Sequence, residues 1–206
     1  MRSSATTRNP PDGPSIPRWI AVRGDDHPRA CTGRKLLALG RARLFSPGRS
    51  AARPLTLDPY ATEVLSRADR PYALRHGVLV QDCSWNALSS RAASGRERLP
   101  SGGGPRRRLP LLLAGNPQHF GRWGELNSVE AMAAALVVLE EREEAASLLE
   151  GFRGGPGFLD VNRDRFDRYA RARDGREVKR MEREGFDGGS RPTESTHVSV
   201  PLRRHL

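Results

Sequence analysis

The chain of 206 residues has little lysine, little cysteine and no long apolar run. Only Lys35 and Lys179 are lysines, so almost all of its positive charge is arginine. Cys31 and Cys83 are too few for a disulfide scaffold. The longest uncharged apolar run, residues 131–139, is far shorter than the roughly 20 residues of a membrane-spanning helix. The basic N-terminus leads into a Pro- and Gly-rich stretch without an apolar core, so we expect no secretory signal. These absences predict a soluble, cytoplasmic protein with no membrane partner.

Positive charge is what the chain has in excess. Lys and Arg total 35 against 24 Asp and Glu, which gives a formal net charge of +11. Such a charge favours a polyanionic partner, RNA or DNA. A basic surface carries no chemistry of its own, and an arginine bias also arises from GC-rich coding DNA. The predicted nucleic-acid partner therefore needs a site to support it.

Composition divides the chain into four segments. Residues 1–16 are predicted to be a disordered basic lead-in and residues 187–206 a disordered tail, because both are rich in Gly, Ser, Thr and Pro. Residues 17–76 form an N-terminal α/β portion, and residues 77–186 a second portion with its own strands and helices. Within the second portion, residues 89–108 are predicted to be a mobile polar insertion.

Short apolar runs and turn signals predict an α/β fold. Strands are expected at residues 19–22, 55–57, 77–81 and 109–115. Helices are expected from an N-cap at Thr32 to a stop at Gly40, at residues 60–68, 166–170 and 178–184, and, as the longest, from a capping box of Asn127 and Glu130 toward Leu149. Residues 140–144 are interpreted as a solvated helix face and residues 151–157 as a loop. Strands that alternate with helices predict a mainly parallel sheet.

The candidate site lies where the predicted strands end. Ligands of open α/β sheets bind beyond the carboxyl ends of the strands, and three such ends are visible, at residues 81–85, 114–117 and before Thr32. The helix N-termini at Thr32 and Ser128 present N–H groups and hydroxyls that favour an anion. A small ligand that carries a carboxylate fits this arrangement.

Structural explanations for the same residues stay open at this point. Thr32 and Asn127 are also adequate as plain helix caps, Asp82 as a turn residue and Trp85 as part of the core. The two cysteines lie too far apart to predict zinc. The histidines are scattered along the sequence, so we do not expect a catalytic histidine. The sequence has no glycine-rich phosphate-binding motif.

Ordered motifs go further than composition. The run from Asp25 to Leu36 (D-D-x-x-x-x-C-T-x-x-K-L) and the tetrapeptide Asp82-Cys83-Ser84-Trp85 resemble blocks of the SPOUT-like ribosome-biogenesis aminocarboxypropyltransferases, which modify small-subunit rRNA in archaea and eukaryotes. Further blocks follow in family order, at residues 57–60, 108–110, 114–117 and 126–131, with closing matches at Phe158, Leu159, Asn162 and Tyr169. The resemblance covers roughly residues 17–186.

The resemblance implies a fold and an activity. The fold is a mostly parallel α/β sheet whose C-terminal part, here residues 77–186, binds S-adenosylmethionine (SAM) within a deep trefoil knot, which is an exception to the rule that chains are not knotted. The activity is transfer of the 3-amino-3-carboxypropyl group from SAM to a pseudouridine or N-methylpseudouridine base of small-subunit rRNA. The family further implies a monomer that acts on rRNA or a pre-ribosomal particle.

The resemblance also implies a set of site residues. Asp82 is the expected proton acceptor, and Trp85 the wall of the pocket near the methyl group. The family further implies cofactor contacts at Thr32, Gln81, Leu109, Gly124 and Ser128. The family usually has an aromatic residue at the position of Gly124, and this chain has Trp123 one place earlier. No metal ligand is implied. Two other readings stay open, a SAM-dependent rRNA methyltransferase of SPOUT type and a non-catalytic factor that binds pre-rRNA.

Overall fold

The computed structural model describes residues 15–22, 31–48, 52–82 and 102–186. Within these ranges the chain forms a five-stranded parallel sheet in the order β2-β1-β4-β3-β5. The strands are β1 Arg18–Val22, β2 Arg43–Leu44, β3 Leu55–Leu57, β4 Val78–Asp82 and β5 Arg106–Arg107. The predicted parallel α/β sheet is confirmed, and the first three predicted strands correspond to β1, β3 and β4.

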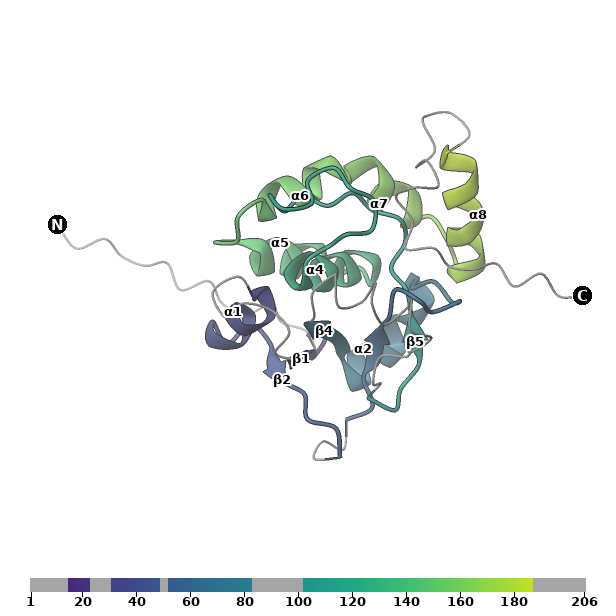
Figure 1. Cartoon of the computed structure of the whole chain (residues 1–206). Coiled ribbons are helices and arrows are strands. Elements are labelled where there is room, and N and C mark those ends of the chain that lie inside the picture. The colour runs from purple at the N-terminus through teal and green to yellow at the C-terminus, as the bar shows by residue number, and fades with distance from the viewer. Residues whose placement is uncertain (1–14, 23–30, 49–51, 83–101, 187–206) are drawn as a thin grey trace, which may run out of the picture.

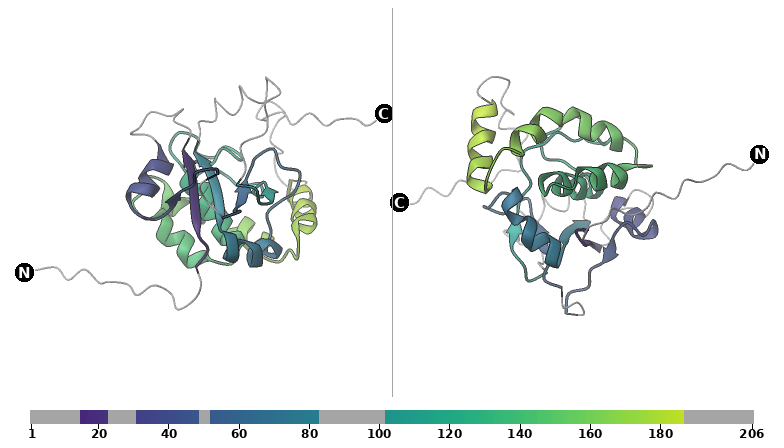
Figure 2. Two further views of the ribbon diagram at one scale, coloured as in Figure 1. Left: turned by 90° about the horizontal axis from the view of Figure 1, so that it is seen from below. Right: turned by 180° about the vertical axis from the view of Figure 1, so that it is seen from behind.

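Helices flank and cover the sheet (Figure 1). They are α1 Thr32–Ala38, the 3-10 helix η1 Arg67–Asp69, α2 Arg70–His76, α4 Ser128–Val138, α5 Arg142–Leu149, α6 Gly155–Val161, α7 Arg163–Tyr169 and α8 Gly175–Phe186. α4 packs against β4, and α5, α6 and α7 pack on α4 as an outer layer (Figures 1 and 2). None of the helices in the described ranges has the length and hydropathy to cross a membrane.

The core lies between β4 and α4. All five residues of β4 are buried, because the strand lies between β1 and β3 and under α4. α4 is buried on most of its surface, and its run of Ala133, Ala134 and Ala135 is fully buried. Small side chains let the helix approach the sheet on one side and α5 on the other. Ile16, placed at the end of the predicted disordered lead-in, is also fully buried and belongs to this core.

The predicted longest helix is two helices. Glu140 has a positive φ of 68° between α4 and α5, so the backbone turns where the sequence pattern runs on. Two acids of the predicted solvated face make ion pairs with distant arginines: Glu141 binds Arg70 at 2.6 Å and Glu144 binds Arg18 at 2.7 Å. The predicted solvated face at residues 140–144 is therefore confirmed only in part: Glu140, Arg142 and Glu143 are exposed, whereas Glu141 and Glu144 are half-buried. The longest described helix is α8, which begins and ends outside its predicted range.

Two further elements differ from prediction. Of the helix predicted at residues 60–68, only residues 67–68 are helical, in η1. Residues 63–65 instead run alongside Arg108 and exchange backbone hydrogen bonds of 2.8–2.9 Å with it. Residues 109–115 are not a strand of the sheet, because the N–H groups of Leu111 and Leu113 donate to the side chains of Glu182 (2.9 Å) and Asn162 (2.8 Å). The predicted loop at 151–157 ends early, since α6 begins at Gly155.

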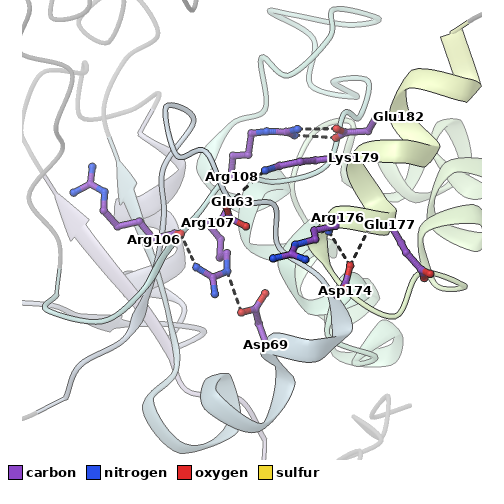
Figure 3. Close-up of polar contacts among 10 residues, drawn as sticks. All are labelled: Glu63, Asp69, Arg106, Arg107, Arg108, Asp174, Arg176, Glu177, Lys179 and Glu182. Carbon is purple, nitrogen blue, oxygen red and sulfur yellow. Dashed lines mark hydrogen bonds and ion pairs between the residues drawn. The ribbon is translucent and has the colours of Figure 1, made fainter. Parts of the chain in front are cut away.

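Three consecutive arginines join β5 to its surroundings. Arg106 forms an ion pair with Asp58, Arg107 with Asp69 at 3.0 Å, and Arg108 with Glu182 of α8 at 2.7 Å. Figure 3 shows the last two pairs. Residues 102–108 of the predicted mobile insertion are therefore ordered parts of the fold, and residues 89–101 lie outside the described residues.

Candidate active site

Asp82 is the centre of the candidate site. It is the last residue of β4 and lies opposite Val22, the last residue of β1, so it stands at the carboxyl edge of the sheet. Its side chain is buried and accepts three hydrogen bonds, from the Cys31 thiol, from the Gly33 N–H (3.1 Å) and from the Ser128 hydroxyl. One carboxylate thus contacts the first turns of α1 and α4.

The start of α1 differs from prediction in its cap. Cys31, not Thr32, is the N-cap: its sulfur accepts the Arg34 N–H at 3.4 Å and donates its proton to Asp82. Burial, together with the hydrogen bond to Asp82, raises the pKa of the Cys31 thiol to about 11, so the thiol stays protonated at neutral pH. Thr32 instead uses its hydroxyl to accept the Ser128 N–H at 3.2 Å, which joins α1 to α4 directly.

The start of α4 is capped as predicted. Asn127 Oδ1 accepts the Glu130 N–H at 2.9 Å, and Glu130 Oε2 accepts the Asn127 N–H at 3.0 Å. Glu130 also accepts the Gly115 N–H at 2.9 Å and the Asn116 side-chain amide at 2.7 Å. Burial raises the pKa of Glu130. The predicted strand end at residues 114–117 is therefore held against the N-terminus of α4 by one buried carboxylate.

Gly33 is required by the close approach of α1 to Asp82. A Cβ at Gly33 would lie 2.5 Å from Asp82 Cγ, which is closer than two non-bonded carbon atoms can approach. Sequence reasoning singled out neither Gly33 nor Cys31 for this role and read Glu130 only as half of a capping box. The available signal was the position of the Cys-Thr-Gly tripeptide at a helix start, but its partner lies 49 residues away in sequence.

The other predicted site residues lie in different surroundings. Gln81 is buried in β4 next to Asp82. Leu109 is half-buried, and its carbonyl accepts the Arg108 guanidinium at 3.0 Å. Gly124 has a φ of 72° and donates its N–H to Leu112 at 2.9 Å. Within the described ranges, no hydrogen bond joins Leu109 or Gly124 to Asp82. Trp85 lies outside the described residues.

The site combines groups that favour ligand groups of opposite charge. The Thr32 hydroxyl and the N-terminus of α4 favour an anionic group. The Asp82 carboxylate, to which the Ser128 hydroxyl donates, favours a cationic or proton-bearing group. Ser128 and Asp82 are both nearly buried, with 9% and 4% of their surfaces exposed. Such a pair of preferences suits the carboxylate and ammonium of an amino acid.

Comparison with known proteins finds a family and relatives that match most of the chain. The family described as "Ribosome biogenesis protein, C-terminal" matches residues 55–186. The 16S rRNA aminocarboxypropyltransferase of Methanosarcina acetivorans is 39% identical over 171 residues, which are 82% of this chain and 94% of the relative. The enzyme of the same name from Methanopyrus kandleri is 37% identical over 166 residues, 80% of this chain and 95% of the relative.

A solved structure supports the same assignment. The SAM-dependent rRNA:acp-transferase Tsr3 from Vulcanisaeta distributa is 33% identical and superposes with a TM-score of 0.68, covering 84% of this chain and 100% of that protein. Both the sequence relatives and this structure are matched over most of their length. The chain therefore belongs to the ribosome-biogenesis family of SAM-dependent rRNA aminocarboxypropyltransferases.

Proposed function

We propose that this protein transfers the 3-amino-3-carboxypropyl group of SAM to a uridine-type base, pseudouridine or N-methylpseudouridine, of small-subunit rRNA. The observation that carries the proposal is the hydrogen-bonded group of Thr32, Ser128 and Asp82 at the carboxyl edge of β4. It occurs in a chain 39% identical to a 16S rRNA aminocarboxypropyltransferase.

The donor set of the site fits the amino-acid end of the cofactor. The hydroxyl of Thr32, with the N–H groups of the first turn of α4, would hold its carboxylate. The Ser128 hydroxyl, which donates to Asp82 in this structure, would turn toward the same carboxylate when the cofactor binds. Gln81 and Leu109 would contribute through backbone groups, a role in which their side chains are not constrained. Gly124 would lie at the edge of the pocket, with Trp123 as the neighbouring aromatic.

Positioning is the main task of the protein in this reaction. When bound, SAM supplies a sulfonium that is already an activated leaving group. Thr32 and Ser128 would fix the amino-acid arm so that its γ-carbon faces the base, which is an orientation effect. Trp85 would occupy the space near the methyl group and so disfavour methyl transfer.

Asp82 would accept the proton that the imide nitrogen of the base loses. Among the residues that the structure describes, Oδ1 accepts hydrogen bonds from the Gly33 N–H and the Ser128 hydroxyl. Oδ2 accepts one hydrogen bond, from the Cys31 thiol. Oδ2 is therefore the atom with lone-pair capacity for the proton. A carboxylate placed in this way typically accelerates proton transfer by about 10² to 10⁴-fold.

Membership in the family supports three finer proposals. Residues 77–186 would form the SAM-binding portion, with the chain threaded as a trefoil knot. The protein would act as a cytoplasmic monomer. Its partner would be small-subunit rRNA, alone or in a pre-ribosomal particle.

The decisive experiment identifies the small-molecule product. The purified protein is incubated with SAM and a small-subunit rRNA hairpin, and the products are separated by chromatography. Methylthioadenosine together with a modified hairpin supports the proposal. S-adenosylhomocysteine would instead mean methyl transfer. Neither product, together with retained binding of the hairpin, would mean that the protein only binds rRNA.

A further inference from the structure

Phe120 is a large apolar residue whose side chain is exposed to solvent. It is 70% exposed, more than Leu39 (49%) and Leu44 (58%), the other exposed large hydrophobic residues of the described chain. It lies at the tip of the turn formed by residues 114–124, which we call the Phe120 turn. An exposed apolar residue on a loose segment needs no explanation, so the rigidity of this turn decides whether Phe120 matters.

Backbone hydrogen bonds join the two segments that flank Phe120 in the turn. The Ala114 N–H donates to Arg122 O at 2.9 Å, and the Gly121 N–H returns to Ala114 O at 2.8 Å. The His119 N–H donates to the side chain of Asn116 at 3.0 Å. Gly121, with a φ of 75°, lets the chain reverse directly after Phe120. The backbone on either side of Phe120 is therefore fixed, although the ring itself is not buried.

The Phe120 turn is fastened to the candidate active site. Glu130 accepts the Gly115 N–H and the Asn116 amide from the turn, and with the same carboxylate the N–H of Asn127. Asn127 directly precedes Ser128, whose hydroxyl binds Asp82. The position of Phe120 is thus set by the same buried carboxylate that fixes the first turn of α4.

Cationic and aromatic groups accompany Phe120. The side chain of Arg122, two residues on, is 57% exposed, and its one ion pair among the described residues is a 3.3 Å contact with Glu125. Arg165 of α7 lies over the ring of Trp123, 4.7 Å from its centroid. Aromatic rings interleaved with arginines are the usual composition of surfaces on which single-stranded nucleic acid binds, with bases stacked on rings and phosphates on guanidinium groups.

We propose that Phe120 is a stacking platform for an unpaired base of the RNA that this protein modifies, with Arg122 as its phosphate contact. The proposal rests on the proposed function for the identity of the partner. The turn would hold a base that neighbours the acceptor, because the turn and Ser128 share the support of Glu130. Stacking on an aromatic ring tolerates every base, so Phe120 would contribute affinity and positioning and would not select a sequence.

The test separates stacking from phosphate contact. Binding of a short fluorescein-labelled oligouridylate is compared with binding of an oligomer of the same length and backbone in which every base is absent. Phe120→Ala should weaken binding of the oligouridylate by about five-fold or more, from the usual strength of base–aromatic stacking, and leave binding of the abasic oligomer unchanged. Phe120→Trp should restore the affinity.

Two control variants complete the test. Arg122→Ala should weaken binding of both oligomers and reduce the dependence of affinity on salt. Leu44→Ala, which removes another exposed large apolar side chain, from β2, should change neither affinity. SAM affinity, measured by calorimetry, should be the same in Phe120→Ala and the unaltered protein.

Three outcomes overturn the proposal. Phe120→Ala could bind oligouridylate as tightly as the unaltered protein does, or it could lose equal affinity for both oligomers. The third outcome is an unaltered protein that does not distinguish the two oligomers. Neither readout requires transfer, so a failure of the proposed function would be visible separately, as an absence of methylthioadenosine from the rRNA reaction.

Discussion

The Ser128 hydroxyl donates to Oδ1 of Asp82 and so joins the first turn of α4 to the last residue of β4. The same oxygen accepts the N–H of Gly33 in α1. One carboxylate oxygen therefore holds the starts of two helices that are 96 residues apart at the Thr32–Ser128 contact. Asp82 contributes to the architecture as well as to the proposed chemistry, and variants at this site need a measurement of each.

Asp82→Asn should abolish most of the transfer while the protein stays folded. Asparagine keeps an oxygen for Gly33 and Ser128 but cannot take up the proton from the base, so we expect methylthioadenosine release to fall by about 10² to 10⁴-fold. SAM affinity by calorimetry and the melting temperature should change much less. Asp164→Asn, at an exposed position in the first turn of α7, is the matched control. Full turnover in Asp82→Asn would show that the proton acceptor is another group.

Cys31 should make stability depend on pH in the alkaline range. Its pKa is raised from 9.0 to about 11 in the folded protein, so the folded state favours the neutral thiol. That contribution is complete below about pH 9 and is lost as the pH rises through about 11. Urea unfolding of the wild type and of Cys31→Ser, measured from pH 8 to 11, should therefore converge as the pH rises. Parallel curves would mean that the thiol makes no such contribution.

Local signals in the sequence predicted much of the sheet and one helix start. The strands β1 and β4 are short apolar runs bounded by turn residues, and the Asn127–Glu130 capping box lies within four residues of chain. Each signal is complete within its own segment, so no distant contact was needed to interpret it.

Elements that depend on distant partners were not predictable. The apolar run at residues 109–115 looks like a strand, but Leu111 and Leu113 donate to side chains 71 and 49 residues later. Cys31 caps α1 because its thiol also binds Asp82, 51 residues on. For the site, the rule that strand ends gather at one edge, together with the family motifs, predicted that Thr32, Ser128 and Asp82 would meet.

Gly33→Ala should destabilise the protein although alanine favours helices. The new Cβ would lie 2.5 Å from Asp82 Cγ, and the Asp82 side chain cannot retreat because three donors hold it. We expect a loss of about 1–3 kcal/mol in the free energy of unfolding, as for other overpacked sites, and weaker SAM binding. Urea unfolding and calorimetry check these two effects.

Gly157→Ala is the control for helix propensity. Gly157 is exposed in α6, and nothing lies within 4 Å of the position of its Cβ. This variant should leave stability unchanged or raise it by up to about 1 kcal/mol. An equal effect of the two substitutions would mean that contact with Asp82 does not constrain Gly33.

Glu182→Gln should weaken both the fold and the SAM site. Glu182 is buried and accepts two hydrogen bonds from Arg108 (2.8 and 2.7 Å) and one from the Leu111 N–H (2.9 Å), so it fixes the residues on both sides of Leu109. Glutamine removes the charge that compensates Arg108 and directs an amide N–H toward one of these donors. We expect a loss of about 2–3 kcal/mol in unfolding free energy, somewhat below the usual cost of breaking a buried pair because Arg108 is partly exposed.

Glu184→Gln separates this effect from a general loss of charge on α8. Glu184 lies two residues along the same helix, is 54% exposed and contacts Arg168 and Arg180 only at 3.6 Å, so its removal should cost less than about 1 kcal/mol. If Leu109 contacts the cofactor through its backbone, Glu182→Gln should also raise the SAM dissociation constant, and Glu184→Gln should not. Equal melting temperatures and equal SAM affinities in the two variants would show that α8 does not position the Leu109 segment.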